Sequence, residues 1–149
     1  MRSMTALFLV LILSVCAMAA SQGKTDPADE VRAVVEDSYI NGAFNALDPD
    51  AMKRGFHPDF AIFSADGEKI KRYPIGEWVS GVARRKADPG FDPANNVWEH
   101  KLPIIDVTGG AAFVKVELSS NGTLVYTDYL SLLKFDSGWR IVAKVYQEH

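Results

Sequence analysis

The chain has 149 residues, of which 48% are hydrophobic and 23% charged, and its formal net charge is −3. This length fits one domain, and the composition is that of an ordinary globular protein, not a disordered or fibrous one. Basic residues form no extended cluster, which argues against a nucleic-acid-binding protein. The one basic run, Arg84-Arg85-Lys86, lies close to Asp88. We expect it to be a solvated helix end and not an anion site.

The first nineteen residues have the pattern of a cleavable export signal. Arg2 supplies the positive start, residues 6–13 form an apolar run, and Ala17-Met18-Ala19 fits the small-residue cleavage rule. The apolar run is too short to span a bilayer, which takes about 20 residues. We therefore predict a signal peptide at 1–19 cut near Ala19, a linker at 20–25 and a mature domain at 26–149. The mature protein would be periplasmic or secreted, without a stable membrane span.

Cys16 is the only cysteine of the chain. It follows Val15, whereas the bacterial lipoprotein motif has Gly, Ala or Ser at that position, so lipid anchoring is disfavoured. Removal of the leader would leave a domain with no cysteine and no disulfide. Such a domain has to be stabilised by its core.

Helix signals come first along the chain. Asp26-Pro27 is a good helix start, and apolar residues then recur at helical spacing as far as Leu47. Asp48-Pro49 predicts the start of a second, short helix at 51–56, which residues 57–59 end. A third helix is expected after residue 74.

Strand signals dominate the rest. Short strands are predicted at 60–63 and 69–73, and longer ones at 97–107, 111–119, 123–135 and 139–147. The Asn121-Gly122 pair between alternating segments is the strongest local hairpin signal. Helices followed by an antiparallel meander predict an α+β domain.

Four segments sharpen this prediction into a family resemblance. They are Tyr39-Ile40-Asn41-Gly42, Phe56-His57-Pro58-Asp59-Phe60, and the pair Asp128-Tyr129-Leu130-Ser131-Leu132-Leu133-Lys134 and Gly138-Trp139-Arg140-Ile141-Val142-Ala143-Lys144. Their order resembles the nuclear-transport-factor-2-like superfamily, and most closely its "putative lumazine-binding" (SnoaL-like) subgroup. The resemblance covers about residues 26–146.

The resemblance implies a cone-shaped fold in which three N-terminal helices pack on a strongly curved, mainly antiparallel sheet. It also implies a hydrophobic pocket between helices and sheet, and a homodimer formed through the outer sheet face. The superfamily contains both enzymes and non-enzymatic binders, so the fold does not decide the function.

Three functions stay open at this point. The first is an exported domain that binds a small apolar or aromatic molecule, which the absence of a strong catalytic pair favours. The second is an isomerase, dehydratase or hydrolase that uses a pocket Asp or His as general acid or base. The third is a dimeric structural or interaction module. None of them implies a cofactor or a nucleic-acid partner.

Asp128, His100 and His57 are the candidate catalytic residues. Asp128 shares the parity of the apolar residues of its predicted strand, so it would face the core, where a lone charge is costly. It is either a pocket acid or base, or a structural residue that pairs with Lys144 or satisfies a backbone group. His100 would be a proton-transfer partner if it faced inward, and an exposed strand histidine otherwise. His57 either contributes to catalysis, or caps the helix or stacks at the pocket rim.

Strand parity gives a conflicting answer for Lys144. On the last strand Trp139 and Ile141 share the parity of the core residues, whereas Arg140 and Lys144 share the other. This pattern predicts that Lys144 lies on the outer face, away from an inward Asp128.

Aromatic residues are the candidates for lining the pocket. They are Tyr39, Trp78, Phe56, Phe60, Tyr73 and Trp98. Each of them is equally explained as a core residue. No two histidines have ligand spacing, and the mature domain would lack cysteine, so no metal site is predicted.

Overall fold

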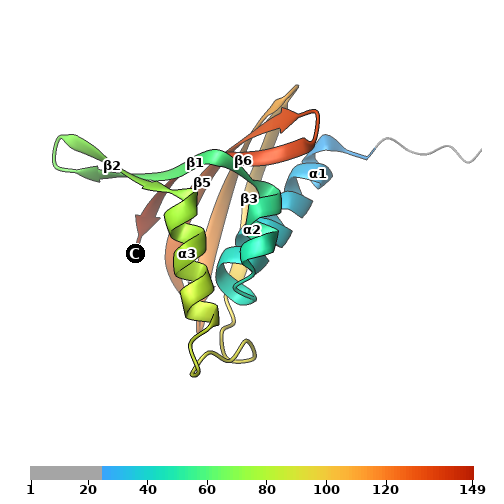
Figure 1. The fold of residues 1–149 in the computed structure, drawn as a ribbon. Coiled ribbons are helices and arrows are strands. Elements are labelled where there is room, and N and C mark those ends of the chain that lie inside the picture. The colour runs from blue at the N-terminus through green and yellow to red at the C-terminus, as the bar shows by residue number, and fades with distance from the viewer. Residues whose placement is uncertain (1–24) are drawn as a thin grey trace, which may run out of the picture.

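The computed structural model describes residues 25–149 (Figure 1). Its elements in chain order are α1 (Pro27–Val34), the π-helix η1 (Val35–Asn45), α2 (Pro49–Gly55), β1 (Phe56–Asp66), β2 (Lys69–Pro74), α3 (Ile75–Lys86), β3 (Glu99–Thr108), β4 (Ala111–Ser120), β5 (Thr123–Phe135) and β6 (Gly138–Glu148). The predicted signal peptide, its cleavage near Ala19 and Cys16 lie outside the described residues, so export stays a prediction. Within residues 25–149 no helix has the length and apolar character needed to cross a membrane.

Side-chain caps stand at the starts of α1 and α2, as the sequence predicts. The Asp26 carboxylate accepts a hydrogen bond of 2.9 Å from the backbone N–H of Ala28. The Asp48 carboxylate accepts bonds of 3.0 and 3.2 Å from the N–H groups of Asp50 and Ala51. Each cap satisfies donors that the first helical turn leaves without a partner.

The predicted first helix has a feature that the sequence did not indicate. After Val34 its backbone changes from α-helical to π-helical hydrogen bonding, which links residues five apart. Tyr39 and Phe44 are five residues apart, and their rings contact each other with centroids 5.3 Å apart. The π-helix therefore places two aromatic side chains on one side, toward the sheet.

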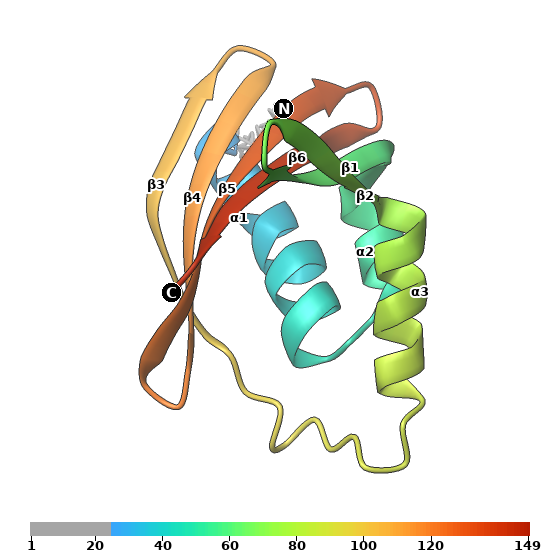
Figure 2. The ribbon, with the colours of Figure 1, turned by 90° about the vertical axis from the view of Figure 1, so that its left-hand side faces the viewer.

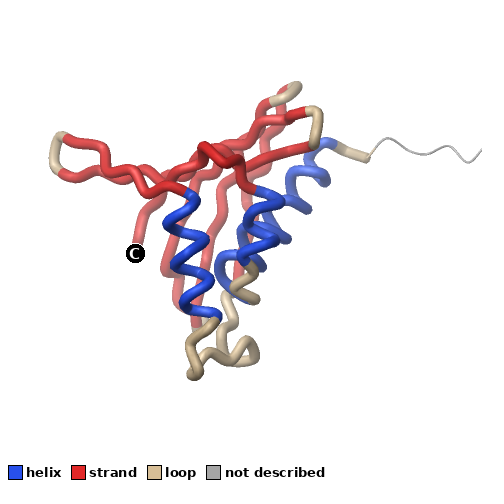
Figure 3. Tube along the Cα trace, viewed as in Figure 1, coloured by secondary structure: helices blue, strands red, loops and turns tan. Residues whose placement is uncertain are grey.

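The six strands form one sheet in the order β2-β1-β6-β5-β4-β3. The β1–β6 pair is parallel and the other neighbouring pairs are antiparallel. The sheet curves around α1, η1, α2 and α3, which all lie on its concave side (Figures 2 and 3). This arrangement confirms the α+β fold of three helical segments on a curved, mainly antiparallel sheet.

Turn signals were reliable, but one strand was predicted too short. Asn121 and Gly122 both have positive φ angles, 51° and 76°, as the tight turn between β4 and β5 requires. In contrast, β1 already begins at Phe56. The pairing of β1 with β6 shifts register between Phe56 and Ala61, so residues 57–59, expected to end a helix, lie in an irregular part of the strand.

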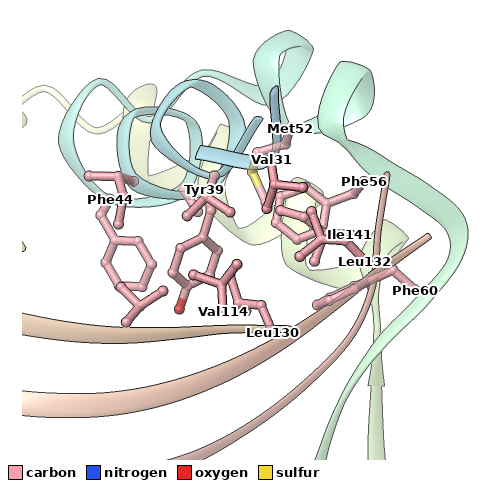
Figure 4. Packing of buried hydrophobic residues seen from close by; sticks show 14 of the residues in the cluster. Val31, Tyr39, Phe44, Met52, Phe56, Phe60, Val114, Leu130, Leu132 and Ile141 are labelled. Carbon is pink, nitrogen blue, oxygen red and sulfur yellow. The ribbon is translucent and has the colours of Figure 1, made fainter. Parts of the chain in front are cut away.

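The core lies between the concave face of the sheet and the helices (Figure 4). The largest fully buried side chains are Tyr39, Phe60, Leu47, Met52, Leu118, Leu130, Leu132, Ile141, Val31, Val35, Val82 and Val114. On the opposite face Phe113 and Tyr129 are partly exposed and stack with centroids 5.9 Å apart. A homodimer through this outer face stays a prediction.

A close approach between η1 and α2 gives a testable prediction. A Cβ atom at Gly55 would overlap the Ser38 side chain, whereas a Cβ at Gly76 in α3 would meet nothing within 4 Å. Gly55→Ala should therefore lower the free energy of unfolding by about 1–3 kcal/mol. Gly76→Ala, the matched control, should be neutral or stabilising by up to about 1 kcal/mol.

Urea unfolding of both variants measures the difference. Adding Ser38→Gly to Gly55→Ala should recover part of the lost stability, because it removes the overlapping side chain. Equal stabilities of the two alanine variants would contradict the packing described.

Candidate functional site

Three polar side chains meet in the core, each from a different element. Tyr39 comes from η1, Asp128 from β5 and Lys144 from β6, and their exposed fractions are 0%, 0% and 5%. The Tyr39 hydroxyl donates a hydrogen bond to one Asp128 carboxylate oxygen. Lys144 Nζ donates to the Tyr39 hydroxyl at 2.7 Å and lies 2.9 Å from Asp128 Oδ1. We call these three residues the buried triad.

A β-bulge in β6 brings Lys144 into the core. The β5–β6 register shifts between Ser131 and Leu132, so that Val142 is left without a partner on β5. An extra residue of this kind reverses the alternation of side chains along a strand. Ile141 before the bulge and Lys144 after it are therefore both buried.

The predicted outer-face position of Lys144 was therefore wrong. The inward position predicted for Asp128 is confirmed, and of the two explanations given for Asp128, its pairing with Lys144 is the contact that the structure contains.

Aromatic rings surround the ammonium group. Lys144 Nζ lies 5.1 to 5.9 Å from five ring centroids, those of Tyr39, Tyr146, Trp78, Phe44 and Tyr126. At these distances the ring faces attract a cation. They leave Lys144 only 5% exposed, so its amine depends mainly on Tyr39 for a hydrogen bond and on Asp128 for a charge partner.

Burial shifts the proton affinity of two members of the triad. It lowers the pKa of the Lys144 amine, against the opposing effect of the nearby Asp128 carboxylate. It also raises the pKa of the Tyr39 hydroxyl, and there Asp128 acts in the same direction. Tyr39 is thus held as a neutral hydroxyl, and the amine gives up its proton more readily than an exposed lysine does.

Lys144 also lines an open cavity of about 440 Å³ between η1, α3 and strands β1, β2, β5 and β6. The wall consists of Phe44, Ile62, Ser64, Lys71, Tyr73, Trp78, Arg85, Tyr126, Lys144 and Tyr146. Tyr39 and Asp128 are not among these residues, so Lys144 connects the buried triad to the cavity. The cavity is less apolar than the sequence predicted, since its lining includes one serine, three cationic side chains and three tyrosine hydroxyls.

The two candidate histidines lie elsewhere. The His57 ring stacks on Phe135 with centroids 4.9 Å apart, and its Nδ1 accepts a bond from the N–H of Asp59. His100 is exposed on β3 and faces a groove beside Glu117. Neither histidine lines the cavity or contacts Asp128. Within residues 25–149 no group of three or more His, Cys, Asp or Glu side chains is placed to hold a metal ion.

The six candidate pocket aromatics lie in three places. Trp78 and Tyr73 line the cavity. Tyr39, Phe56 and Phe60 are buried in the core behind it. Trp98 stacks on the cavity residue Tyr126 with centroids 6.0 Å apart and is not itself part of the wall.

Several cavity residues were not identified from the sequence. Arg85 lies in the basic run interpreted as a solvated helix end. It is exposed, yet it contributes to the cavity wall, as does Lys71 from β2. Helical spacing could have found Arg85, because it follows Trp78 by seven residues and so lies on the same side of α3. Lys71 and Tyr146 depend on strand pairing and gave no local signal.

Residues 26–147 match the model of the family described as "Putative lumazine-binding". The curated protein Aldolase FrzH from Cladobotryum sp. is 29% identical over 127 residues, which cover 82% of this chain and 94% of the aldolase.

Solved structures share the fold. An NTF2-like protein of unknown function from Shewanella baltica OS155 is 26% identical with a TM-score of 0.63, over 85% of this chain and 98% of that protein. An NTF2-like protein of unknown function from Silicibacter pomeroyi DSS-3 also has a TM-score of 0.63, at 21% identity over 81% of this chain and 94% of that one. Because the family model spans nearly all of the described domain, this chain belongs to the "Putative lumazine-binding" family of the nuclear-transport-factor-2-like superfamily.

Proposed function

We propose that the protein binds a small, flat organic anion in the cavity that Lys144 lines. One observation carries this proposal: the ten lining residues include five aromatic rings and three cationic side chains, and no carboxylate. The cations are Lys71, Arg85 and Lys144. The family description supports a small-molecule ligand.

The dimensions and chemistry of the cavity agree with such a ligand. A volume of about 440 Å³ lies within the range of small-molecule sites, roughly 300–1,000 Å³. Aromatic walls favour a flat ligand through stacking. Asp128 pairs with Lys144, whereas no ion pair of the exposed Lys71 or Arg85 occurs among residues 25–149, so these two side chains provide the positive charge that attracts an anion.

Calorimetric titration with 2-naphthoate tests the proposal. The acid should bind, and its uncharged analogue 2-naphthylmethanol should bind at least about tenfold more weakly, which corresponds to about 1.4 kcal/mol. Arg85→Gln should weaken naphthoate binding by about three- to tenfold, and so should raised salt, because exposed charges are screened.

The neighbouring exposed arginine is a matched control. Arg84 lies on the same helix turn but does not line the cavity, so Arg84→Gln should leave naphthoate binding unchanged. Equal binding of acid and alcohol, or equal effects of the two arginine substitutions, would contradict the proposed anion site.

A second candidate function is catalysis of a reaction at a carbonyl group. It is favoured by the buried triad, in which an amine, a hydroxyl and a carboxylate lie within hydrogen-bond or ion-pair distance beside a cavity. Groups of this kind transfer protons when their pKa values are shifted by burial. The relative from Cladobotryum, named an aldolase, supports the same direction.

A further inference from the structure

Lys144 is placed to do more than attract an anion. Lys144 belongs both to the buried triad and to the cavity wall, so it is the member of the triad that a ligand in the cavity meets. Its exposed fraction is 5%, and aromatic rings surround it. A purely electrostatic role would not require this burial, since a surface lysine attracts an anion without any desolvation cost.

The surroundings of the amine are those of a nucleophilic lysine. A desolvated lysine loses its proton more easily, and the neutral amine attacks carbonyl carbons. Asp128 Oδ1, 2.9 Å from Nζ, can accept the proton that the ammonium group has to release. Tyr39 holds the nitrogen through the 2.7 Å hydrogen bond and is itself fixed by its bond to Asp128.

We propose that Lys144 forms a covalent iminium with an aldehyde or ketone that carries a carboxylate, which Lys71 and Arg85 bind at the cavity wall. The chemical class of the ligand rests on the proposed anion-binding function. The covalent role of Lys144 extends it from binding to reaction at the carbonyl carbon.

The reaction balances without any further reactant. The ammonium of Lys144 gives one proton to Asp128, and the nitrogen lone pair forms a bond to the carbonyl carbon. The C–O π electrons move to oxygen, which takes a proton from the attacking nitrogen. The proton held by Asp128 then goes to the hydroxyl group, which leaves as water while the nitrogen lone pair forms the C=N bond. In total, one carbonyl compound and one lysine ammonium give one iminium and one water.

Charge conservation favours this product in a buried site. The iminium carries the same single positive charge as the ammonium that it replaces. The Asp128 carboxylate, which is fully buried, therefore keeps a cationic partner. A reaction that discharged Lys144 would leave this carboxylate without one, at a cost of several kcal/mol.

Reductive trapping of the full-length protein tests the proposal. The protein is incubated at neutral pH with 4-carboxybenzaldehyde and sodium cyanoborohydride, and modified lysines are located by peptide mass mapping. We expect Lys144 to be labelled about tenfold faster than any other lysine. Benzaldehyde, which lacks the carboxylate, should label it more slowly. The wild-type map decides the outcome, so no folded variant of Lys144 is needed.

A matched variant and a non-reactive analogue separate the two proposals. Lys101→Met, on exposed strand β3, should leave labelling of Lys144 unchanged. If 4-carboxybenzyl alcohol binds but the aldehyde does not label Lys144, the proposed iminium is contradicted, whereas the proposed anion site is not. Labelling of Lys144 at equal rates by both aldehydes would support Lys144 as the nucleophile but contradict the proposal that the ligand carries a carboxylate. Labelling spread over exposed lysines would overturn the covalent role.

Discussion

Asp128→Asn is expected to lower the free energy of unfolding by about 3–5 kcal/mol, because it leaves the ammonium of Lys144 buried without a charge partner. Asparagine is close to aspartate in size, and its carbonyl oxygen can still accept the bond from the Tyr39 hydroxyl. The loss would therefore come from the missing charge and not from a cavity. Urea unfolding at neutral pH gives the value.

A double-mutant cycle isolates the ion pair. Lys144→Met alone should also destabilise the protein, since it leaves the Asp128 carboxylate buried without its cation. The double variant Asp128→Asn/Lys144→Met carries no buried charge at this position and should be clearly more stable than the two single losses added together predict. Additive losses would show that the two side chains do not stabilise each other.

The pH dependence of the stability of Asp128→Asn follows from the lowered pKa of Lys144. A lowered pKa means that the folded state binds fewer protons than the unfolded state, in which the amine titrates near its ordinary value of 10.5. Stability from this group is lost as pH falls and recovered as pH rises toward that value. Asp128 opposes the lowering, so Asp128→Asn should strengthen this dependence.

Tyr39 sets the upper limit of the pH range in which the two stabilities can be compared. Its pKa is raised above the ordinary value of 10.0, so the unfolded state ionises first and stability falls above about pH 10. The comparison therefore belongs between about pH 7 and pH 9.5. A destabilisation by Asp128→Asn that is the same at both ends of that range would contradict a buried, titrating Lys144.

Local signals explain why the fold could be predicted from the sequence. Asp26 and Asp48 cap helices through contacts with residues two or three positions away, and Asn121-Gly122 adopts its turn for reasons of backbone conformation. Such features depend on neighbouring residues only. Strand bounds in the C-terminal half accordingly agree with prediction to within two residues.

The candidate site was harder to predict, because two features that form it have no local signal in the sequence. The bulge at Val142 and the π-helical backbone of η1 each decide which side chains face the core. The sequence therefore identified Asp128 and Tyr39 as candidates but placed Lys144 on the wrong face. A bulge reverses every later side chain of a strand, so simple alternation fails beyond it.

Trp78→Ala is expected to lower the free energy of unfolding by about 3–5 kcal/mol, a loss comparable to that of Asp128→Asn. The indole is the central ring of an aromatic cluster, with centroids 5.5 to 6.4 Å from those of Phe56, Phe60, Tyr39 and Phe44. It attaches α3 to the core, in which Val82 is the one fully buried residue of that helix. Removing the indole takes away these ring contacts and widens the open cavity that Trp78 lines.

The loss should be concentrated in α3, and hydrogen exchange can show this. Backbone amides of α3 should exchange faster in Trp78→Ala. The strands that α3 mainly lies against are β1 and β2, so the amides of β4 and β5 should exchange faster only through global unfolding. Trp78→Phe keeps an aromatic ring and should lose less stability, with α3 still protected. Uniform acceleration across the sheet and α3 would instead mean that the indole stabilises the whole domain and does not specifically attach the helix that carries Arg85. Because the same ring contacts Lys144 at 5.6 Å, Trp78→Ala should also admit water to the amine, so that selective labelling of Lys144 declines together with the protection of α3.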